Sequence, residues 1–449
     1  MPSANRLRGV LRSGPLLLML GLGGMAVSLA GPSLGLTGAS GGAISDSPKE
    51  VIDQVWQIVY RDYLDSSGSY SDSRWRQLRR TILTKSYPST GESYEAIRGM
   101  LASLDDPYTR FLDPKEFKEM QIDTSGELRG VGIQLSLDKE TKELIVVAPI
   151  DGTPASRAGV QPKDVIVSID GEDTRGMTTE DAVKLIRGPE GSEVVLGLRR
   201  QGAVIRVPLK RARIEINAVT TSLNTSADGS TKVGYIRLKQ FNANASKEMR
   251  AAIQAHEKGG AQGYVLDLRS NPGGLLEASI DIARQWLDEG TIVSTRTREG
   301  IRDVRRATGN AITDKPMVVL IDQGSASASE ILSGALQQNQ RAQLVGQKTF
   351  GKGLVQAVRR LADGSGMTVT VAKYLTPDGT DIHKNGIEPD VAEKFTEQDM
   401  RQFRSQDLGT QRDRQYRTAE KTLLQVLRTK AAGAPYQPGS SNINAALRG

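Results

Sequence analysis

A run of small residues around Ser327 has the sequence context of a nucleophile. The apolar segment Met317–Ile321 predicts a buried strand, and small residues after Asp322 predict a tight loop that leads into a helix starting near Ser327. This order of elements presents a serine hydroxyl to a substrate carbonyl, and the N–H of Ala328 at the helix start can donate to an oxyanion. Ser327 and Glu330 also match an S-x-x-E capping box, so a purely structural serine stays open.

A second segment, "TFGKGLVQ", places Lys352 between two glycines and Gln356 four residues further on. An amine acts as a base only after it loses its proton, and burial lowers the pKa of a lysine toward that condition. The amide oxygen of Gln356 would then orient the amine, because both side chains lie on one side of a helix or a strand. An exposed loop lysine is the alternative at this point.

A third segment, "YVLDLRSNPGG", predicts a strand that turns through Gly273 and Gly274 into a helix. Glycine N–H groups at a helix start can bind an oxyanion. A simple strand-to-helix turn would use similar residues, so the segment is weak support by itself.

Composition narrows the chemistry further. The 449 residues contain no cysteine, which excludes disulfides, thiolate zinc sites and a cysteine nucleophile, and only two histidines, His256 and His383. Most hydrolytic nucleophiles are activated by an imidazole, so this scarcity favours a lysine base. The net charge of +7 includes three arginines of the first 30 residues, and no basic block or aromatic-basic interleaving indicates nucleic-acid binding.

The elements that would position these residues fall into distinct stretches. Helical apolar spacing over Lys49–Asp62, Ser73–Thr84 and Tyr94–Leu104 predicts a small helical N-terminal domain. It ends at "SLDDPYTRFLDPKEF", where Pro107 and Pro114 break any longer helix.

Short β-runs then follow from Gly126 to Lys210, interrupted by a helix that Thr178 and Asp181 begin as a capping box. This stretch resembles a PDZ domain, including the loop "RGVGIQL". The resemblance implies that four residues of the loop bind the terminal carboxylate of a substrate: Gly130, Val131, Gly132 and Ile133. We expect Gly130 and Gly132 to turn backbone N–H groups toward that anion, and the next strand to pair with the peptide.

Beyond Ile214 strands and helices alternate, which predicts an α/β core with parallel pairing. The expected elements are strand Val233–Leu238, helix Ser246–Glu257, strand Gly263–Leu268, helix Leu275–Trp286 and strand Met317–Ile321, followed by a hairpin around "LADGSGMTVTVAKYL".

In this order, "LDDPYTRFLDP", the PDZ-like stretch, "LDLRSNPGG", "GSASASE" and "TFGKGLVQ" resemble the C-terminal processing (tail-specific) serine peptidases. The resemblance implies that Ser327 is the nucleophile, Lys352 the general base and Gln356 the residue that positions the lysine. It also implies oxyanion donors at Ala328 and at Gly273 or Gly274, a core of the crotonase type, and no metal or cofactor. A Ser–Lys dyad agrees with the shortage of histidine.

The fold class expected is therefore multidomain α+β, with a helical N-terminal domain, a PDZ β-domain and a crotonase-like α/β peptidase core. The boundaries are 1–30 for a signal peptide or anchor, 31–115 for a linker and the helices, 116–210 for the PDZ domain, 211–395 for the core, and 396–449 for a C-terminal helical segment and disordered tail.

The first 30 residues combine three arginines, an apolar run and small residues at Ser28 and Ala30, as in a signal peptide. We therefore expect export to a periplasm or thylakoid lumen, and an uncleaved membrane anchor stays open. The expected partners are protein or peptide substrates with free C-termini, no nucleic acid is expected, and a homodimer stays open.

Tail capture by the PDZ domain could complete the active site, with Arg187 as the candidate contact. A solvent-exposed arginine favoured by the helix dipole is the alternative.

Three other functions match parts of the sequence. "GQKTFGKG" matches a phosphate-binding loop except that Gly353 replaces the hydroxyl residue that binds magnesium. "GSASA" approximates the nucleophile elbow of an α/β-hydrolase, with His383 downstream, although alanine replaces the second glycine. A PDZ scaffold with an inactive core is the third, and the complete set of Ser327, Lys352 and Gln356 argues against it.

Overall fold

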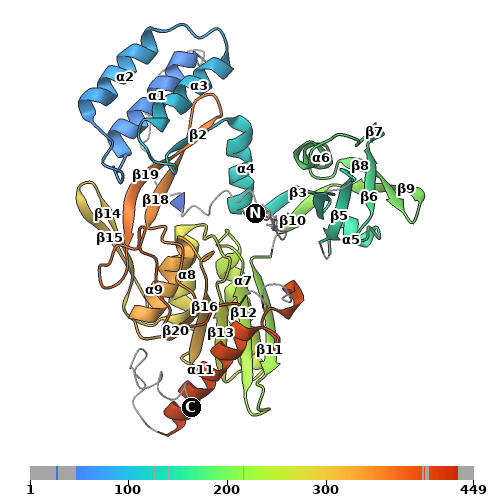
Figure 1. Ribbon diagram of the computed structural model, residues 1–449, viewed down its shortest axis with the longest axis vertical. Helices are drawn as coiled ribbons and strands as arrows, with labels where there is room; N and C mark the ends of the chain where they lie inside the picture. The colour runs from blue at the N-terminus through green and yellow to red at the C-terminus, as the bar shows by residue number, and fades with distance from the viewer. Residues whose placement is uncertain are drawn as a thin grey trace, which may run out of the picture.

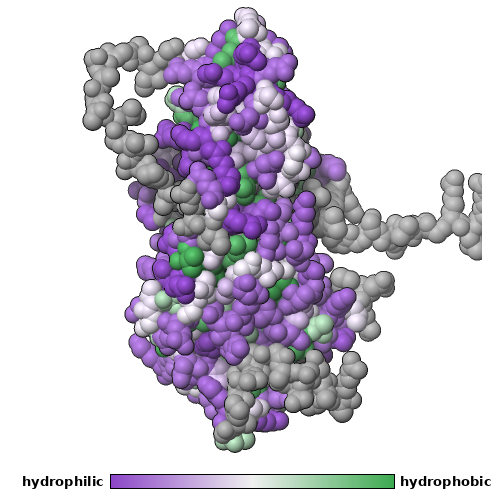
Figure 2. Space-filling model, turned by 90° about the vertical axis from the view of Figure 1, so that its left-hand side faces the viewer, coloured by the Kyte–Doolittle hydropathy of each residue, from purple (hydrophilic) through white to green (hydrophobic). Residues whose placement is uncertain are grey.

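The computed structural model describes residues 27–28, 47–125, 127–138, 141–150, 152–215, 217–396, 399 and 404–432. A helical unit lies at one end, an α/β body at the other, and a small β-rich unit projects to the side (Figure 1). The face shown in Figure 2 is mostly hydrophilic, with its hydrophobic residues scattered in small groups. Within the described ranges, no helix is both long and apolar enough to cross a membrane.

Most of the predicted leader, most of the linker, and the tail after Gly433 lie outside the described residues.

The helical unit comprises α1 (Pro48–Asp62), α2 (Asp72–Thr84) and α3 (Thr90–Ala102). Helix α3 begins earlier than its apolar spacing predicts, because the Ser89 hydroxyl accepts a hydrogen bond from the N–H of Glu92. Buried residues such as Ile52 and Ile97 form one cluster with Met367 and Val369 of the neighbouring sheet. The helices therefore cover one face of that sheet.

The main sheet of the body has the order β11-β12-β13-β16-β17-β20, and all its neighbours are parallel except β11 and β12. Its strands are β11 (Val219–Thr225), β12 (Lys232–Leu238), β13 (Gly263–Asp267), β16 (Met317–Ile321), β17 (Ala342–Gly346) and β20 (Val391–Ala392). Helices α7 (Ala245–Lys258), α8 (Leu276–Trp286) and α9 (Ala328–Gln338) share one hydrophobic cluster with it, and α11 (Arg414–Ala431) covers the opposite side. The predicted alternation and parallel pairing are confirmed.

A second sheet carries part of the candidate site. Its strands are β1 (Val27–Ser28), β2 (Arg110–Leu112), β14 (Thr291–Thr297), β15 (Gly300–Arg306), β18 (Leu354–Arg360) and β19 (Gly366–Leu375). The predicted hairpin is β18 and β19, which pair antiparallel, and β2 pairs with β19. The two-residue β1 pairs in parallel with Gln356 and Ala357 of β18.

The projecting unit contains five antiparallel strands in the order β4-β5-β6-β8-β9, with β7 paired to β6. Its elements are β4 (Ile133–Leu137), β5 (Leu144–Pro149), α5 (Pro154–Arg157), β6 (Val165–Ile169), β7 (Glu172–Asp173), α6 (Thr179–Ile186), β8 (Glu193–Arg200) and β9 (Ala203–Lys210). The predicted capping box of Thr178 and Asp181 is formed at the start of α6.

Two antiparallel strands, β3 (Glu127–Gly130) and β10 (Ala212–Glu215), connect this unit to the rest of the chain. Helix α4 (Pro114–Ser125) precedes β3 and lies between the helical unit and the β3–β10 ribbon (Figure 1). A short 3-10 helix (Ser405–Asp407) precedes α11.

Candidate active site

Ser327 lies at the turn between β16 and α9, as the sequence predicts, and its side chain is fully buried. Its φ of 58° is unusual for a residue with a side chain and indicates backbone strain at this turn. Among the described residues, its hydroxyl has no hydrogen-bond partner. The carboxylate of Glu330 instead accepts a hydrogen bond from the N–H of Ser327 at 2.7 Å. The hydroxyl is therefore free for other chemistry.

Glu330 links the two predicted catalytic segments. One of its oxygens accepts from the N–H groups of Ser327, at 2.7 Å, and Lys352, at 2.9 Å. The other accepts from the hydroxyl of Thr349 at 2.6 Å and the N–H of Gly351 at 2.7 Å. Burial raises the pKa of Glu330, and these hydrogen bonds act in the opposite direction. A single carboxylate thus fixes the distance between the backbones of Ser327 and Lys352.

Lys352 lies in the connection between β17 and β18, and only 3% of it is exposed. The alternative of an exposed loop lysine is therefore wrong. The chain next to Lys352 is tightly packed. A Cβ at Gly353 would lie 2.5 Å from the backbone nitrogen of His383, so a larger residue would not fit at this position. Burial, with a smaller contribution from the Arg110 guanidinium, lowers the pKa of Lys352 from 10.5 to about 8.

The segment from Asp106 to Arg110 borders this lysine, although the sequence assigned none of its residues to the site. The Nζ atom of Lys352 lies 4.7 Å from the ring centroid of Tyr108. The Nε and Nη2 atoms of Arg110 are buried and have no hydrogen-bond partner among the described residues. An aromatic face and a second cation therefore surround the amine and limit its contact with water.

Gln356 lies on β18 and is fully buried. Its Nε2 lies 3.5 Å from the hydroxyl oxygen of Thr370 on β19, which donates to the Asp106 carboxylate at 2.7 Å. The same Asp106 oxygen accepts from the Thr109 hydroxyl at 2.7 Å. Within the described chain, Oε1 of Gln356 has no hydrogen-bond partner. The contact with Thr370 therefore involves Nε2 of Gln356 and not Oε1.

The backbones of Ser327 and Lys352 are linked through Glu330, but no hydrogen bond joins the three functional side chains in this structure. Neither the Ser327 hydroxyl nor Oε1 of Gln356 has a partner in the described part of the chain, so the amine of Lys352 is bonded to neither. Catalytic hydrogen bonds are often long in a free enzyme and shorten when substrate binds. Proton transfer from Ser327 to Lys352 therefore requires these side chains to move from the positions seen here.

Two of the predicted oxyanion donors, Gly273 and Ala328, lie next to the serine. A Cβ at Gly273 would lie 2.7 Å from the carbonyl oxygen of Ala326 and 2.9 Å from the nitrogen of Ala328. The N–H of Gly273 donates to Oδ1 of Asn271 at 2.9 Å, so this N–H group already has a hydrogen-bond acceptor. Gly274, whose φ is 141°, and Ala328 remain the candidate donors of the predicted set.

The predicted tail-binding loop borders a small pocket of about 80 Å³ between β4 and α6. The pocket is lined by Gly130, Val131, Gly132, Ile133 and Arg187, together with apolar residues that include Leu135, Val183 and Ile186. Gly132 has a φ of 79°, as its predicted role requires. The expectation that Gly130 turns the backbone is wrong, because Gly130 is a residue of β3 and pairs with Ala212.

Two of the alternative chemistries are not supported by the geometry. The phosphate-loop interpretation is wrong, because the segment with Gly353 leads from β17 into β18 and not into a helix. His383 makes no hydrogen bond with the Ser327 hydroxyl, which is unpartnered among the described residues. Burial lowers the pKa of His383. The described ranges also hold no cluster of three or more acidic or histidine side chains placed to bind a metal.

Known proteins are similar to this chain in sequence and in fold. Residues 232–393 match the model of peptidase family S41, and residues 145–200 match a PDZ domain. The carboxyl-terminal-processing protease of Synechocystis sp. is 49% identical over 339 residues, covering 75% of this chain and 79% of the relative. The carboxy-terminal processing protease CtpA of Bacillus subtilis is 38% identical over 333 residues, covering 72% of this chain and 70% of the relative.

Among solved structures, a photosystem II D1 C-terminal processing protease is similar with a TM-score of 0.53 and 40% identity. The match covers 78% of this chain and 93% of that one. By extent of coverage and level of identity, the chain belongs to the carboxyl-terminal-processing proteases of peptidase family S41 and contains a PDZ domain.

Proposed function

We propose that this serine protease is an endopeptidase that cleaves proteins near their C-termini with a dyad of Ser327 and Lys352. The observation that carries the proposal is the buried amine of Lys352, whose pKa is lowered to about 8, together with the buried Ser327 hydroxyl, which has no hydrogen-bond partner among the described residues. An amine with this pKa is partly neutral near pH 7 to 8 and can accept the proton of a hydroxyl.

In the proposed cycle, Oγ of Ser327 attacks the peptide carbonyl carbon while its proton moves to Nζ of Lys352. The carbonyl oxygen becomes an oxyanion that accepts hydrogen bonds from the N–H groups of Gly274 and Ala328. The C–N bond then breaks, and Lys352 returns the proton to the leaving amine. Water hydrolyses the acyl-enzyme with Lys352 again acting as the base, and Oε1 of Gln356 holds the neutral amine in position.

We further propose that the PDZ domain binds the free C-terminus of the substrate. The pocket beside Gly132 is small and apolar, and an extended tail could pair with β4. The predicted leader supports export to a periplasm or lumen, where the substrates would be exported proteins. A crotonase-type core, retention of the N-terminus as a membrane anchor, and a homodimer remain predictions.

The test uses a peptide with a free tail and three proteins: the wild type, Ser327→Ala and Lys352→Ala. Cleavage by the wild type alone, read by mass spectrometry of the products, is the expected result. His383→Ala is the matched control and should retain activity. Cleavage by both wild type and Ser327→Ala would contradict the dyad, and cleavage by none would favour the inactive scaffold.

A further inference from the structure

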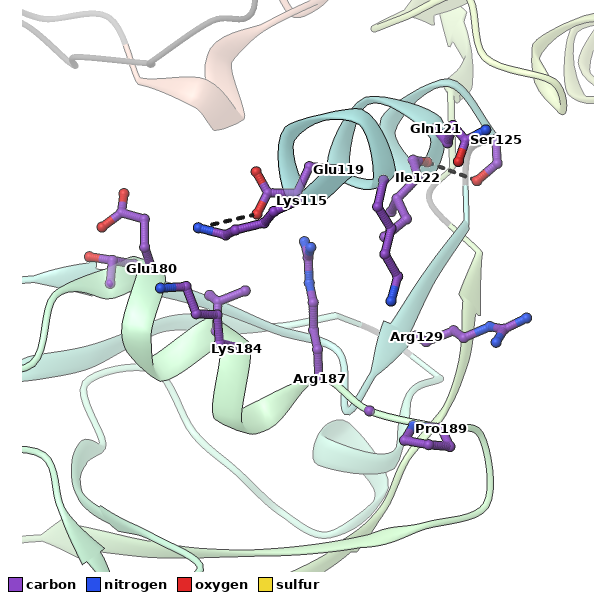
Figure 3. A pocket seen from close by; sticks show the side chains of 14 residues that line it. Lys115, Glu119, Gln121, Ile122, Ser125, Arg129, Glu180, Lys184, Arg187 and Pro189 are labelled. Atoms are coloured by element: carbon purple, nitrogen blue, oxygen red, sulfur yellow. Dashed lines mark hydrogen bonds and ion pairs between the residues drawn. The ribbon is translucent and has the colours of Figure 1, made fainter. Parts of the chain in front are cut away.

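A cavity of about 910 Å³ lies between α4 and the PDZ helix α6. Figure 3 shows α4 on one side of it, α6 on the other, and Arg187 pointing from the end of α6 toward α4. Residues from α4, from β3 and from one face of α6 line the cavity. Its apolar lining includes Ile122, Val183 and Pro189.

The polar lining of this cavity is mainly basic. The five basic residues are Lys115, Lys118, Arg129, Lys184 and Arg187, against two acidic ones, Glu119 and Glu180. Lys115 lies 3.9 Å from Glu119, and Lys184 lies 3.2 Å from Asp181. Lys118, Arg129 and Arg187 form no ion pair with any residue that the structure describes, so their charges are available to a ligand.

The cavity adjoins the small pocket of the PDZ domain. Arg129, Val183 and Arg187 line both, and Gly130 of the tail-binding loop packs near the Arg187 side chain. A peptide whose last residue occupies the small apolar pocket would therefore have its preceding residues beside the larger basic cavity. An extended chain places alternate side chains on opposite sides, so some of them would face α4.

We propose that this cavity selects substrate tails with acidic residues upstream of an apolar C-terminal residue. Carboxylates of the tail would lie near Lys118, Arg129 and Arg187, whose positive charges complement them. The inference rests on the proposed recognition of free tails by the PDZ domain, and adds a preference for charge to it.

Binding to the full-length Ser327→Ala protein tests the proposal, because this variant should not consume the peptide. Three fluorescent peptides share the same apolar last residues and carry four upstream residues that are all Glu, all Gln or all Lys. Anisotropy at low ionic strength should show the Glu peptide bound about tenfold more tightly than the Lys peptide. The difference should shrink as added salt screens the charges.

A charge reversal supplies the matched variant. Lys118→Glu combined with Arg129→Glu should remove or reverse the preference, because both substitutions place negative charge in the cavity. Arg206→Glu is the control, since Arg206 is exposed on β9 and lines neither pocket. This control should leave the order of the affinities for the three peptides unchanged.

Several outcomes would overturn the inference. Equal affinity for the three peptides would do so, as would a preference that the double variant leaves intact. Binding of anionic lipid vesicles without any preference for the Glu peptide would assign the cavity to a membrane. Amidated versions of the peptides separate recognition of the free C-terminus from the preference for acidic residues. If amidation does not change the affinity, recognition of the free C-terminus fails. The charge preference is read separately, by comparing the three peptides that have a free C-terminus.

Discussion

At the scale of single residues, Lys352 shows how the candidate site conflicts with stability. Its pKa falls from 10.5 to about 8 on folding, so the folded protein holds the proton less tightly than the unfolded chain. The folded state is therefore destabilised at pH values below about 8, and the penalty disappears as the pH rises from 8 to 10.5. This shift lowers the free energy of unfolding by about 3 kcal/mol at pH 7.

Replacing Lys352 with methionine should remove that penalty. Methionine has a similar length and no charge, so Lys352→Met should raise the melting temperature at pH 7 while it abolishes peptidase activity. The gain should be smaller at pH 10, where the wild-type lysine is already mostly neutral. Lys348→Met is the control, because Lys348 is largely exposed and pairs with Glu388. Calorimetry that found Lys352→Met less stable at pH 7 would contradict a buried, disfavoured charge.

The same pKa predicts the pH dependence of catalysis. A general base works in its neutral form, so kcat/KM should rise with pH, with an apparent pKa of about 8. The charge of Arg110 contributes to this lowered pKa, so Arg110→Gln should move the rise to higher pH. Lys348→Gln should not move it. A pH profile unchanged by Arg110→Gln would show that burial alone sets the pKa.

At the scale of elements, local sequence signals predict much of the framework. Strand Met317–Ile321 is predicted with its observed bounds, because a continuous apolar run between turn residues is typical of a buried parallel strand. The capping box that begins α6 is also predicted, since it depends on residues only three positions apart. The proposed nucleophile and base are found in the same way, from short segments with small residues around them.

Residues that act through long-range contacts could not be found in this way. Asp106 and Thr370 are hydrogen-bonded although 264 positions separate them, and neither has a local pattern that predicts the contact. Tyr108 belongs to a segment whose prolines indicate only the end of a helix. The sequence indicates only a capping role for Glu330, because its bonds to Thr349 and Gly351 come from another loop. Folding the two sheets together creates these contacts.

In the turn before α8, Gly273 packs closely against Ser327. Gly273 has a φ of 99°, and a Cβ there would lie 2.9 Å from Cβ of Ser327. Gly273→Ala should displace the serine turn and reduce kcat/KM about 100-fold, as expected for a displacement of about 1 Å. Gly309→Ala is the matched control, because Gly309 has a φ of 71° and a methyl group there would have no atom within 4 Å. Equal losses in both variants would indicate backbone strain and not crowding of Ser327.

At the scale of the whole molecule, α4 connects the PDZ domain with the sheet of the candidate site. Phe117 and Met120 of α4 pack with Leu112 of β2 and Val358 of β18. A Cβ at Gly366, the first residue of β19, would lie 2.2 Å from the Phe117 ring, which shows how closely α4 contacts this sheet. On its other side α4 faces Arg187 across the basic cavity (Figure 3). Movement of the PDZ domain relative to α4 would therefore act on the strands that carry Gln356 and Thr370.

This connection predicts the effect of Arg187→Ala. We expect tail capture to change the position of Arg187 relative to α4, and the wild type to cleave a substrate with a free carboxylate faster than its amidated form. In Arg187→Ala the ratio of the two kcat/KM values should approach one, whereas Arg206→Ala, on the exposed side of β9, should keep the wild-type ratio. If Arg187→Ala retains both the activity and its dependence on a free tail, Arg187 is only an arginine at a helix end, and the PDZ domain regulates cleavage by another route.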